Sequence, residues 1–267
     1  MNFELTEERK MLQDGLRRFL RETYTPALRA ELVEADCGFS RDVWSGLAEM
    51  GVLGAAFDEQ LGGFAGDART LALVMMELGR GLAVEPFLSS AVMAGRVLSD
   101  AGDTDAVAAI IEGSQIPVLA HDAGADPFAA PRISASRCEE GFRLDGEVRL
   151  VRNGDVATQF LISAEIDGEV GIFRVDRNAL NVQEIRLIDA AGAVSLRLDQ
   201  LTLATDARLQ FSTSARFVLD DALEWGIFGL AAESLGLIQA ANAATFEYLT
   251  TRKQFGTLIG TFQALQH

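Results

Sequence analysis

The chain has 267 residues, of which 49% are hydrophobic and 23% are charged. This composition excludes an intrinsically disordered or collagen-like protein. Its net charge of −16 repels phosphate backbones and anionic lipid surfaces, so we expect neither nucleic acid nor a membrane as a partner. We expect no transmembrane helix, because no run reaches 18 consecutive apolar residues. The N-terminus lacks the basic-then-apolar pattern of a signal peptide, so we expect a cytoplasmic protein.

The metal-ligating and thiol side chains are few. Cys37 and Cys138 are too few for a disulfide framework or a four-cysteine zinc site, and His121 and His267 lie far apart in the sequence. We therefore expect two reduced thiols and no metal site.

Residues 1–114 have a helical pattern. Thr6, Ser40 and Asp67 are predicted N-caps, and Gly51, Gly102 and Gly113 are predicted to follow helix ends. The expected helices begin near residue 7 and cover about 41–50, 68–82, 88–101 and 104–112. Glu85-Pro86-Phe87 is expected to mark a break before a helix.

Short apolar runs separated by turn residues follow, which predicts a small antiparallel β domain over residues 115–214. Asp145-Gly146 between hydrophobic residues predicts a hairpin turn. The expected strands are 116–120, 142–151, 159–163, 170–175, 194–198 and 201–204.

The helical period returns at about Ala215, and one helix could run to about Thr251, roughly 50 Å at 1.5 Å per residue. Three glycines lie inside it, Gly226, Gly229 and Gly236. They indicate either close packing of a neighbour or ligand, or a broken or kinked helix. We expect Gly256 to end the helical pattern and a new helix to start near Thr261. Because residues 264–267 lie inside a helical pattern, we expect a further helical segment after His267.

The segment from Tyr248 to His267, YLTTRKQFGTLIGTFQALQH, resembles the junction between the first two helices of the last domain in the acyl-CoA dehydrogenase family. Residues 235–241, the early LTEERKML and the loop 61–66 are similar to the same family. The resemblance implies an α+β multidomain fold. We expect an N-terminal helical domain (1–114), a middle antiparallel β domain (115–214) and the first helices of an incomplete C-terminal helical bundle (215–267).

The middle domain is more narrowly similar to the small, non-catalytic subunits of heteromeric members, such as those of pimeloyl-CoA dehydrogenase and of steroid-degrading enzymes. Where most members have a TEPxxGSD-type flavin segment, this chain has AHDAGAD, with His121 and Ala123 at two altered positions. Where they have an aromatic residue, Ile and Thr or Ser, it has Leu150-Val151-Arg152. Arg152 would need a phosphate, a carboxylate or solvent, because an unpaired buried charge is costly. These departures weaken the case for a flavin pocket of this chain's own.

A second family segment is intact. In the family, the arginine of RKQFG and the glutamine of the FQ pair reach FAD bound mainly by a neighbouring subunit; by position these are Arg252 and Gln263. A guanidinium grips pyrophosphate oxygens in a bidentate manner. Phe255 could pack on adenine, and Gln254 could hydrogen-bond nearby. The alternative is that Arg252 only caps the last carbonyls of a helix.

No residue of the chain is predicted to be the catalytic base. In most members the base is a glutamate late in the last domain, beyond His267; in others it lies on the helix at a position that Gly226 occupies here. Glu224 and Glu233 do not match it and are expected to be solvated or salt-bridged. The loop 61–66 is not a Rossmann motif, and His121 lacks the GxSxG elbow of a hydrolase.

The sequence therefore predicts a subunit of an FAD-dependent acyl-CoA dehydrogenase of fatty acid or steroid catabolism. It would complete a partner's FAD site in an α2β2 assembly with a homologous subunit. The other implied partners are the acyl-CoA substrate and an electron-transfer flavoprotein. The alternatives are a self-sufficient homo-oligomeric dehydrogenase, a non-catalytic packing partner and, on the same fold, a flavin monooxygenase or nitroalkane oxidase.

Overall fold

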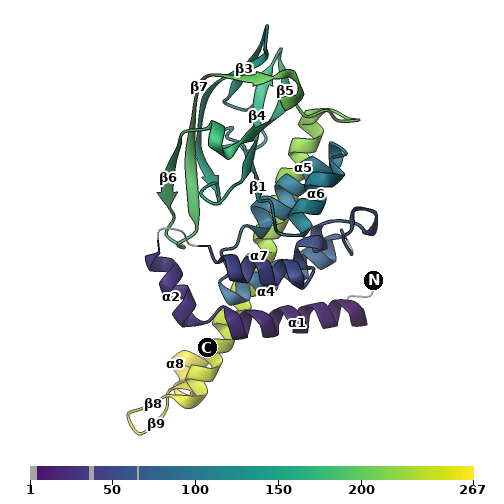
Figure 1. Ribbon diagram of the computed structural model, residues 1–267. Helices are drawn as coiled ribbons and strands as arrows, with labels where there is room; N and C mark the ends of the chain where they lie inside the picture. The colour runs from purple at the N-terminus through teal and green to yellow at the C-terminus, as the bar shows by residue number, and fades with distance from the viewer. Residues whose placement is uncertain (1–4, 36–38, 65) are drawn as a thin grey trace.

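The computed structural model describes residues 5–35, 39–64 and 66–267 (Figure 1). In the first part, short helical turns separate the longer helices. The elements are α1 (Glu7–Thr23), α2 (Pro26–Glu34), α3 (Arg41–Glu49), η1 (Val52–Ala56), η2 (Glu59–Leu61), α4 (Ala68–Gly81), η3 (Phe87–Ala94), α5 (Gly95–Asp100) and α6 (Thr104–Ile111). Cys138 is a free thiol. Cys37 lies outside the described residues, so the expectation of two reduced thiols stays a prediction.

The three predicted N-caps are confirmed. Thr6, Ser40 and Asp67 each accept a hydrogen bond from the backbone N–H three residues further on. The sequence analysis missed α2, although Thr25 caps it and Pro26 fills its first position, a common helix start. The helical segment expected over about 88–101 is confirmed in position, but its first part is the π-helix η3 and only its second part, α5, is α-helical. Apolar periodicity does not separate these two helical forms.

One mixed sheet follows the helices. Its strands are β1 (Pro117–Ala120), β2 (Ser134–Cys138), β3 (Gly141–Arg152), β4 (Gln159–Ile166), β5 (Glu169–Asp176), β6 (Val182–Arg186) and β7 (Gly192–Ala204). The order is β1-β4-β2-β3-β7-β6, with β5 paired to β4. Most pairs are antiparallel, as predicted, but β4 runs parallel to both of the strands β1 and β2. The two strands expected over 194–198 and 201–204 are one strand, β7.

The predicted hairpin turn at Asp145-Gly146 is wrong. Both residues lie inside β3, where the pairing with β7 shifts register between Leu144 and Gly146. Gly146 has φ +132°, and a β-carbon on it would lie 3.0 Å from Cδ1 of Ile133. The glycine therefore marks a β-bulge, which needs the same backbone freedom as a turn.

Helix α7 (Ala215–Thr251) is one continuous helix of 37 residues, so the broken-helix alternative is wrong. Its three interior glycines each face a close neighbour, as the packing interpretation predicted. Gly226 faces Met93 and Gly229 faces Leu88, both on η3, and Gly236 faces the backbone of α4. Glycines here let α7 approach the N-terminal helices closely.

By length and composition, α7 is the one helix in the described ranges that could cross a membrane. This is weak evidence, because the core helix of a soluble protein meets the same test. The expectation that no helix spans a membrane stays a prediction.

After α7 the chain forms a small hairpin and a short helix that project away from the sheet (Figure 1). The elements are β8 (Lys253–Gln254), β9 (Thr257–Leu258), η6 (Ile259–Thr261) and α8 (Gln263–Gln266). The helix ends at Thr251, as predicted, and Gly256 lies in the hairpin turn that follows it. We call residues 252–263 the arm.

Candidate functional site

The turn of the arm presents an aromatic ring to solvent. Phe255 and Gly256 have φ angles of +52° and +81°, and they are the two residues that join β8 to β9. Positive φ at both positions suits a tight two-residue hairpin. The backbone N–H of Ile259 donates to the carbonyl oxygen of Arg252 at 3.0 Å, which closes the base of the hairpin. The Phe255 side chain is 94% exposed.

The predicted cofactor-binding side chains of the arm have free hydrogen-bonding groups. Arg252, Gln254, Phe255 and Gln263 are all exposed. Within the described part of the chain, no hydrogen bond or ion pair engages the side chains of Arg252, Gln254 or Gln263. Only the backbone N–H of Arg252 bonds to α7, at the Tyr248 carbonyl oxygen. The guanidinium of Arg252 therefore does not cap the last carbonyl oxygens of the helix. Its N–H donors can reach an external anion.

A cavity of about 260 Å³ lies between α4, η3, the end of β3 and the first half of α7. It brings together His121, Leu150 and Arg152, three residues at which the chain departs from the flavin motifs. Its wall is mostly apolar and is lined by Met75, Leu78, Ala83, Val84, Phe87, Leu88, Met93, Leu119, Val151, Leu223 and Leu230. Glu85, Ser89, Asn153 and Glu233 add polar groups.

Arg152 pairs with a carboxylate, one of the three possibilities that the sequence left open. Its Nη2 lies 2.7 Å from Oδ2 of Asp189, and its side chain is 40% exposed. Partial burial alone would raise the pKa of Asp189, but the hydrogen bonds from Arg152 and from the Ala191 N–H hold that pKa below its usual value. The charge of Arg152 is thus already compensated within the chain.

His121 holds a loop in place. Its Nδ1 lies 2.7 Å from Oγ of Ser163, and its Nε2 lies 2.8 Å from the carbonyl oxygen of Pro127. A carbonyl oxygen only accepts, so Nε2 carries the proton and Nδ1 accepts from the serine. Burial lowers the pKa of His121, and the ring is neutral near pH 7. Ser163 is buried, so this pair anchors the loop to β4 and does not form an open nucleophile site.

Asn153 ties the cavity wall to the helical part. Its Oδ1 accepts from the Ser89 hydroxyl at 2.9 Å, and its Nδ2 donates to the Val84 carbonyl oxygen at 3.2 Å. The two bonds fix the start of η3 against the end of β3.

Glu85 is the buried carboxylate that sequence reasoning missed. It is 7% exposed, and neither carboxylate oxygen makes a hydrogen bond of ordinary geometry within the described chain. Burial raises its pKa to about 7, although nearby backbone N–H groups, including that of Ser40, lower it in part. The available signal was a single acid inside the apolar run LAVEPFL.

Glu224 and Glu233, the two glutamates that the sequence analysis considered as catalytic bases, lie in different environments. Glu224 is exposed, as predicted. Glu233 is half-buried in the cavity wall and has no ion pair within the described ranges, so its carboxylate is only partly solvated. Burial raises its pKa, and nearby Arg152 only partly opposes this. The close approach of α4 and α7 causes this burial.

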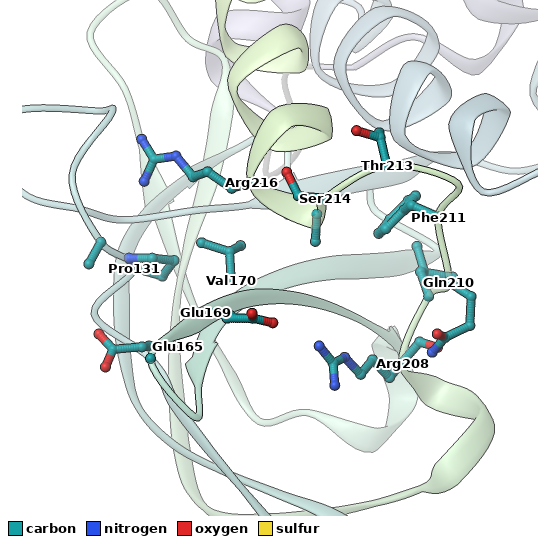
Figure 2. A pocket seen from close by; sticks show the side chains of 14 residues that line it. Pro131, Glu165, Glu169, Val170, Arg208, Gln210, Phe211, Thr213, Ser214 and Arg216 are labelled. Carbon is teal, nitrogen blue, oxygen red and sulfur yellow. The ribbon is translucent and has the colours of Figure 1, made fainter.

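A second cavity, of about 480 Å³, lies where the turn between β4 and β5 meets the segment leading into α7 (Figure 2). Two glutamates, Glu165 and Glu169, and two arginines, Arg208 and Arg216, line it. Arg216 is engaged: it bonds to Asp220 at 2.8 Å and to the carbonyl oxygens of residues 128 and 129. The two glutamates and the two arginines balance in charge, and Arg216 already bonds within the protein. The lining therefore favours neither an anionic nor a cationic ligand.

The two regions fit a flavin nucleotide unequally. The small cavity offers no aromatic face at Leu150, no hydroxyl at Arg152 and no free ring nitrogen at His121. The arm instead offers a free guanidinium, free amides and an exposed phenyl ring, which suit a pyrophosphate and a flat base. In the described residues, no group of three or more His, Cys, Asp or Glu could hold a metal ion.

Comparison with known proteins identifies the family. The sequence profile "Acyl-CoA dehydrogenase, N-terminal domain" matches residues 6–110, and "Acyl-CoA dehydrogenase, C-terminal domain" matches residues 217–267. The chain is 28% identical to the acyl-CoA dehydrogenase FadE27 of Mycobacterium tuberculosis over 275 aligned residues, which cover 99% of this chain and 71% of the relative.

Solved structures of the same family are similar to this chain along almost its whole length. The ChsE4-ChsE5 complex from Mycobacterium tuberculosis superposes with a TM-score of 0.85 at 27% identity, covering 99% of this chain and 72% of that chain. The Tcur3481-Tcur3483 steroid ACAD (G363A variant) superposes with a TM-score of 0.86 at 28% identity, covering 98% and 72%. The chain therefore has the acyl-CoA dehydrogenase fold and belongs to the acyl-CoA dehydrogenase family.

Proposed function

We propose that this chain is a subunit of an FAD-dependent acyl-CoA dehydrogenase and that its arm completes the FAD site of a neighbouring subunit. When bound, FAD accepts a hydride from the β-carbon of an acyl-CoA thioester while a base removes the α-proton. Arg252 would hold the pyrophosphate, Phe255 would cover the adenine, and Gln254 and Gln263 would add hydrogen bonds.

One observation carries this proposal: the cofactor-binding side chains of the arm are exposed and unpaired, although the arm's backbone is ordered by its own hairpin. If the arm served only to pack within the chain, these donors would form hydrogen bonds inside the chain. The altered residues around the small cavity support the same assignment, because they leave the chain's own flavin ring without its usual contacts.

The preferred assembly is an α2β2 complex with a homologous dehydrogenase subunit. Two of the structural relatives above are described as pairs of different proteins, which favours this arrangement over a homo-oligomer. We further propose an electron-transfer flavoprotein as electron acceptor and a cytoplasmic location. The division at residues 114 and 214 into three domains stays a prediction.

Two other assignments compete. A self-sufficient homo-oligomer would take its catalytic glutamate from beyond His267 and bind one FAD per chain. A non-catalytic packing partner would touch no flavin at all.

The test is the visible flavin spectrum of the protein purified alone and with its homologous subunit, for wild type and Arg252→Ala. Arg18→Ala, an exposed arginine on α1, is the control. We expect a colourless chain alone, a yellow complex with fewer than one FAD per chain, and an Arg252→Ala complex that releases FAD on filtration. Full flavin occupancy in the Arg252→Ala complex would refute the proposal. A yellow chain alone, with one FAD per chain, would establish the homo-oligomer instead.

A further inference from the structure

The carboxyl group of Glu85 and the guanidinium of Arg29 are neighbours that do not bond to each other. Both carboxyl oxygens of Glu85 and Nη1 of Arg29 are buried and lack a hydrogen bond of ordinary geometry. The charge of Arg29 lies close enough to lower the pKa of Glu85 in part, but no ion pair joins the two side chains within the described ranges. Unpaired polar atoms away from water are costly, so a bond between these two groups would satisfy both.

Arg29 instead ties α2 to the turn between β6 and β7, residues 187–191. Its Nη2 donates to the backbone carbonyl oxygen of Asp189 in that turn. The carboxylate of Asp189 holds Arg152 at the end of β3, with 2.7 Å between Oδ2 and Nη2. The turn is therefore fastened to α2 by Arg29 and to β3 by Arg152.

The groups that face Glu85 from α1 and α3 carry no charge that could hold it. Tyr24, at the end of α1, is buried, and burial together with the nearby Glu85 raises the pKa of its phenol, so the ring stays neutral. Ser40, at the start of α3, contributes a backbone N–H. His121, in the wall of the small cavity, has its pKa lowered by burial and is neutral near pH 7.

The charged groups on the cavity side are also unable to hold Glu85. Arg152 is paired with Asp189, and Glu233 is another acid. Arg29 is therefore the cation, within the described part of the chain, that an ionised Glu85 can recruit.

The two acceptors available to Arg29 differ in strength. The Asp189 carbonyl oxygen is neutral, whereas an ionised carboxylate can accept two parallel N–H bonds from a guanidinium and is the stronger partner. A protonated carboxyl has no charge to offer, and the carbonyl oxygen then competes well. The charge of Glu85 thus decides which acceptor Arg29 prefers.

We propose that Arg29 is a two-position switch, which ties α2 to the β6–β7 turn when Glu85 is neutral and turns to the Glu85 carboxylate, releasing the β6–β7 turn, when Glu85 is ionised. The change needs rotation about the bonds of one long side chain. Because burial raises the pKa of Glu85 to about 7, the turn is fastened in mildly acidic solution and released in mildly basic solution. The released turn carries Asp189, so the switch acts on the partner of Arg152.

A pH titration of the purified protein by NMR tests the proposal, because chemical shifts of the folded state are not altered by a small unfolded population. The probes are the Nε signal of Arg29 and the backbone amide signals of Ala190 and Ala191 in the turn. In wild type, we expect all three signals to shift between pH 6 and pH 8.5 with a shared midpoint near pH 7.

Variants separate the switch from a direct effect of the Glu85 charge on the turn. Glu85→Gln, which stays neutral, should abolish the shared transition. Arg29→Met, which keeps a long side chain without its charge, should abolish it at Ala190 and Ala191 although Glu85 still titrates. Arg186→Ala is the matched control, because Arg186 also joins the sheet to α2, through the carbonyl oxygens of residues 32 and 33. It should keep the transition, as should Glu233→Gln.

The proposal is overturned if the turn amides of wild type do not titrate near pH 7, or if their transition survives in Glu85→Gln or in Arg29→Met. It is also overturned if the turn amides titrate while the Arg29 Nε signal does not. Circular dichroism confirms the fold of each variant, and Glu85→Gln with the Arg29 signal decides the question if Arg29→Met does not fold. Arg252→Ala should titrate like wild type whatever its flavin content, which separates this inference from the proposed function.

Discussion

Gly236 packs its α-carbon directly against the carbonyl oxygen of Met76. A β-carbon built on Gly236 would lie only 1.9 Å from that oxygen. The contact is mutual: a β-carbon on Gly79 of α4 would be 2.2 Å from the carbonyl oxygen of Glu233 on α7. The two helices therefore cross at paired glycines, and this crossing places Glu233 in the cavity wall.

We expect Gly236→Ala to lower the free energy of unfolding by about 1–3 kcal/mol, because the added methyl group must push backbone away from backbone. Urea unfolding of the variant measures this. Gly15→Ala is the matched control, since its β-carbon would meet only the Cε of Met50 at an ordinary 3.6 Å. That change should stabilise by up to about 1 kcal/mol through helix propensity. Equal effects at the two glycines would show that the crossing tolerates a side chain.

The helices were largely predictable because their signals are local. A capping side chain such as Ser40 or Asp67 bonds to a backbone N–H three residues away, so a short stretch of sequence contains both partners. The sheet was less predictable. Strands β2 and β6 were missed because both are mostly exposed and carry few apolar residues. Their pairing depends on distant strands, which no local pattern encodes.

The two candidate sites differ in the same way. The arm could be found from the sequence because its residues lie within one continuous segment, Arg252 to Gln263. The small cavity could not, because its wall comes from five elements, α4, η3, β1, β3 and α7, that meet only after folding. Glu85 has a local signal in its apolar run, but its burial without a partner is a property of the tertiary structure.

The stability of the protein should depend on pH through Glu85. Burial raises its pKa to about 7 in the folded state, above the value of 4.5 usual for a glutamate. The folded state therefore binds this proton more tightly than the unfolded chain does. The resulting stabilisation is fully present below about pH 4.5 and is lost as the pH rises through about 7, at a cost on the order of 3 kcal/mol.

Glu85→Gln, which stays neutral at every pH, should not suffer this loss. Urea unfolding at pH 5 and pH 8.5 measures the difference between variant and wild type. We expect that difference to shift in favour of Glu85→Gln by about 2–3 kcal/mol between the two pH values. Glu224→Gln should show no such shift, because its carboxylate is exposed. A difference for Glu85→Gln that does not change with pH would show that the folded and unfolded states hold the proton equally.

The phenyl ring of Phe255 should matter for cofactor binding and not for folding. Because it is 94% exposed, its removal in Phe255→Ala should change the free energy of unfolding of the isolated chain by less than about 0.5 kcal/mol. Phe160→Ala provides the contrast, since that ring is fully buried in the sheet core and its loss should cost about 3–5 kcal/mol. In the complex with the homologous subunit, Phe255→Ala should weaken FAD binding by roughly five- to tenfold, the value expected for one lost aromatic contact. Fluorescence titration of the apo complex with FAD measures this. Unchanged FAD affinity would mean that the exposed ring meets protein in the assembly and not the cofactor, and the polar side chains of the arm, Arg252, Gln254 and Gln263, would then carry its contact with FAD.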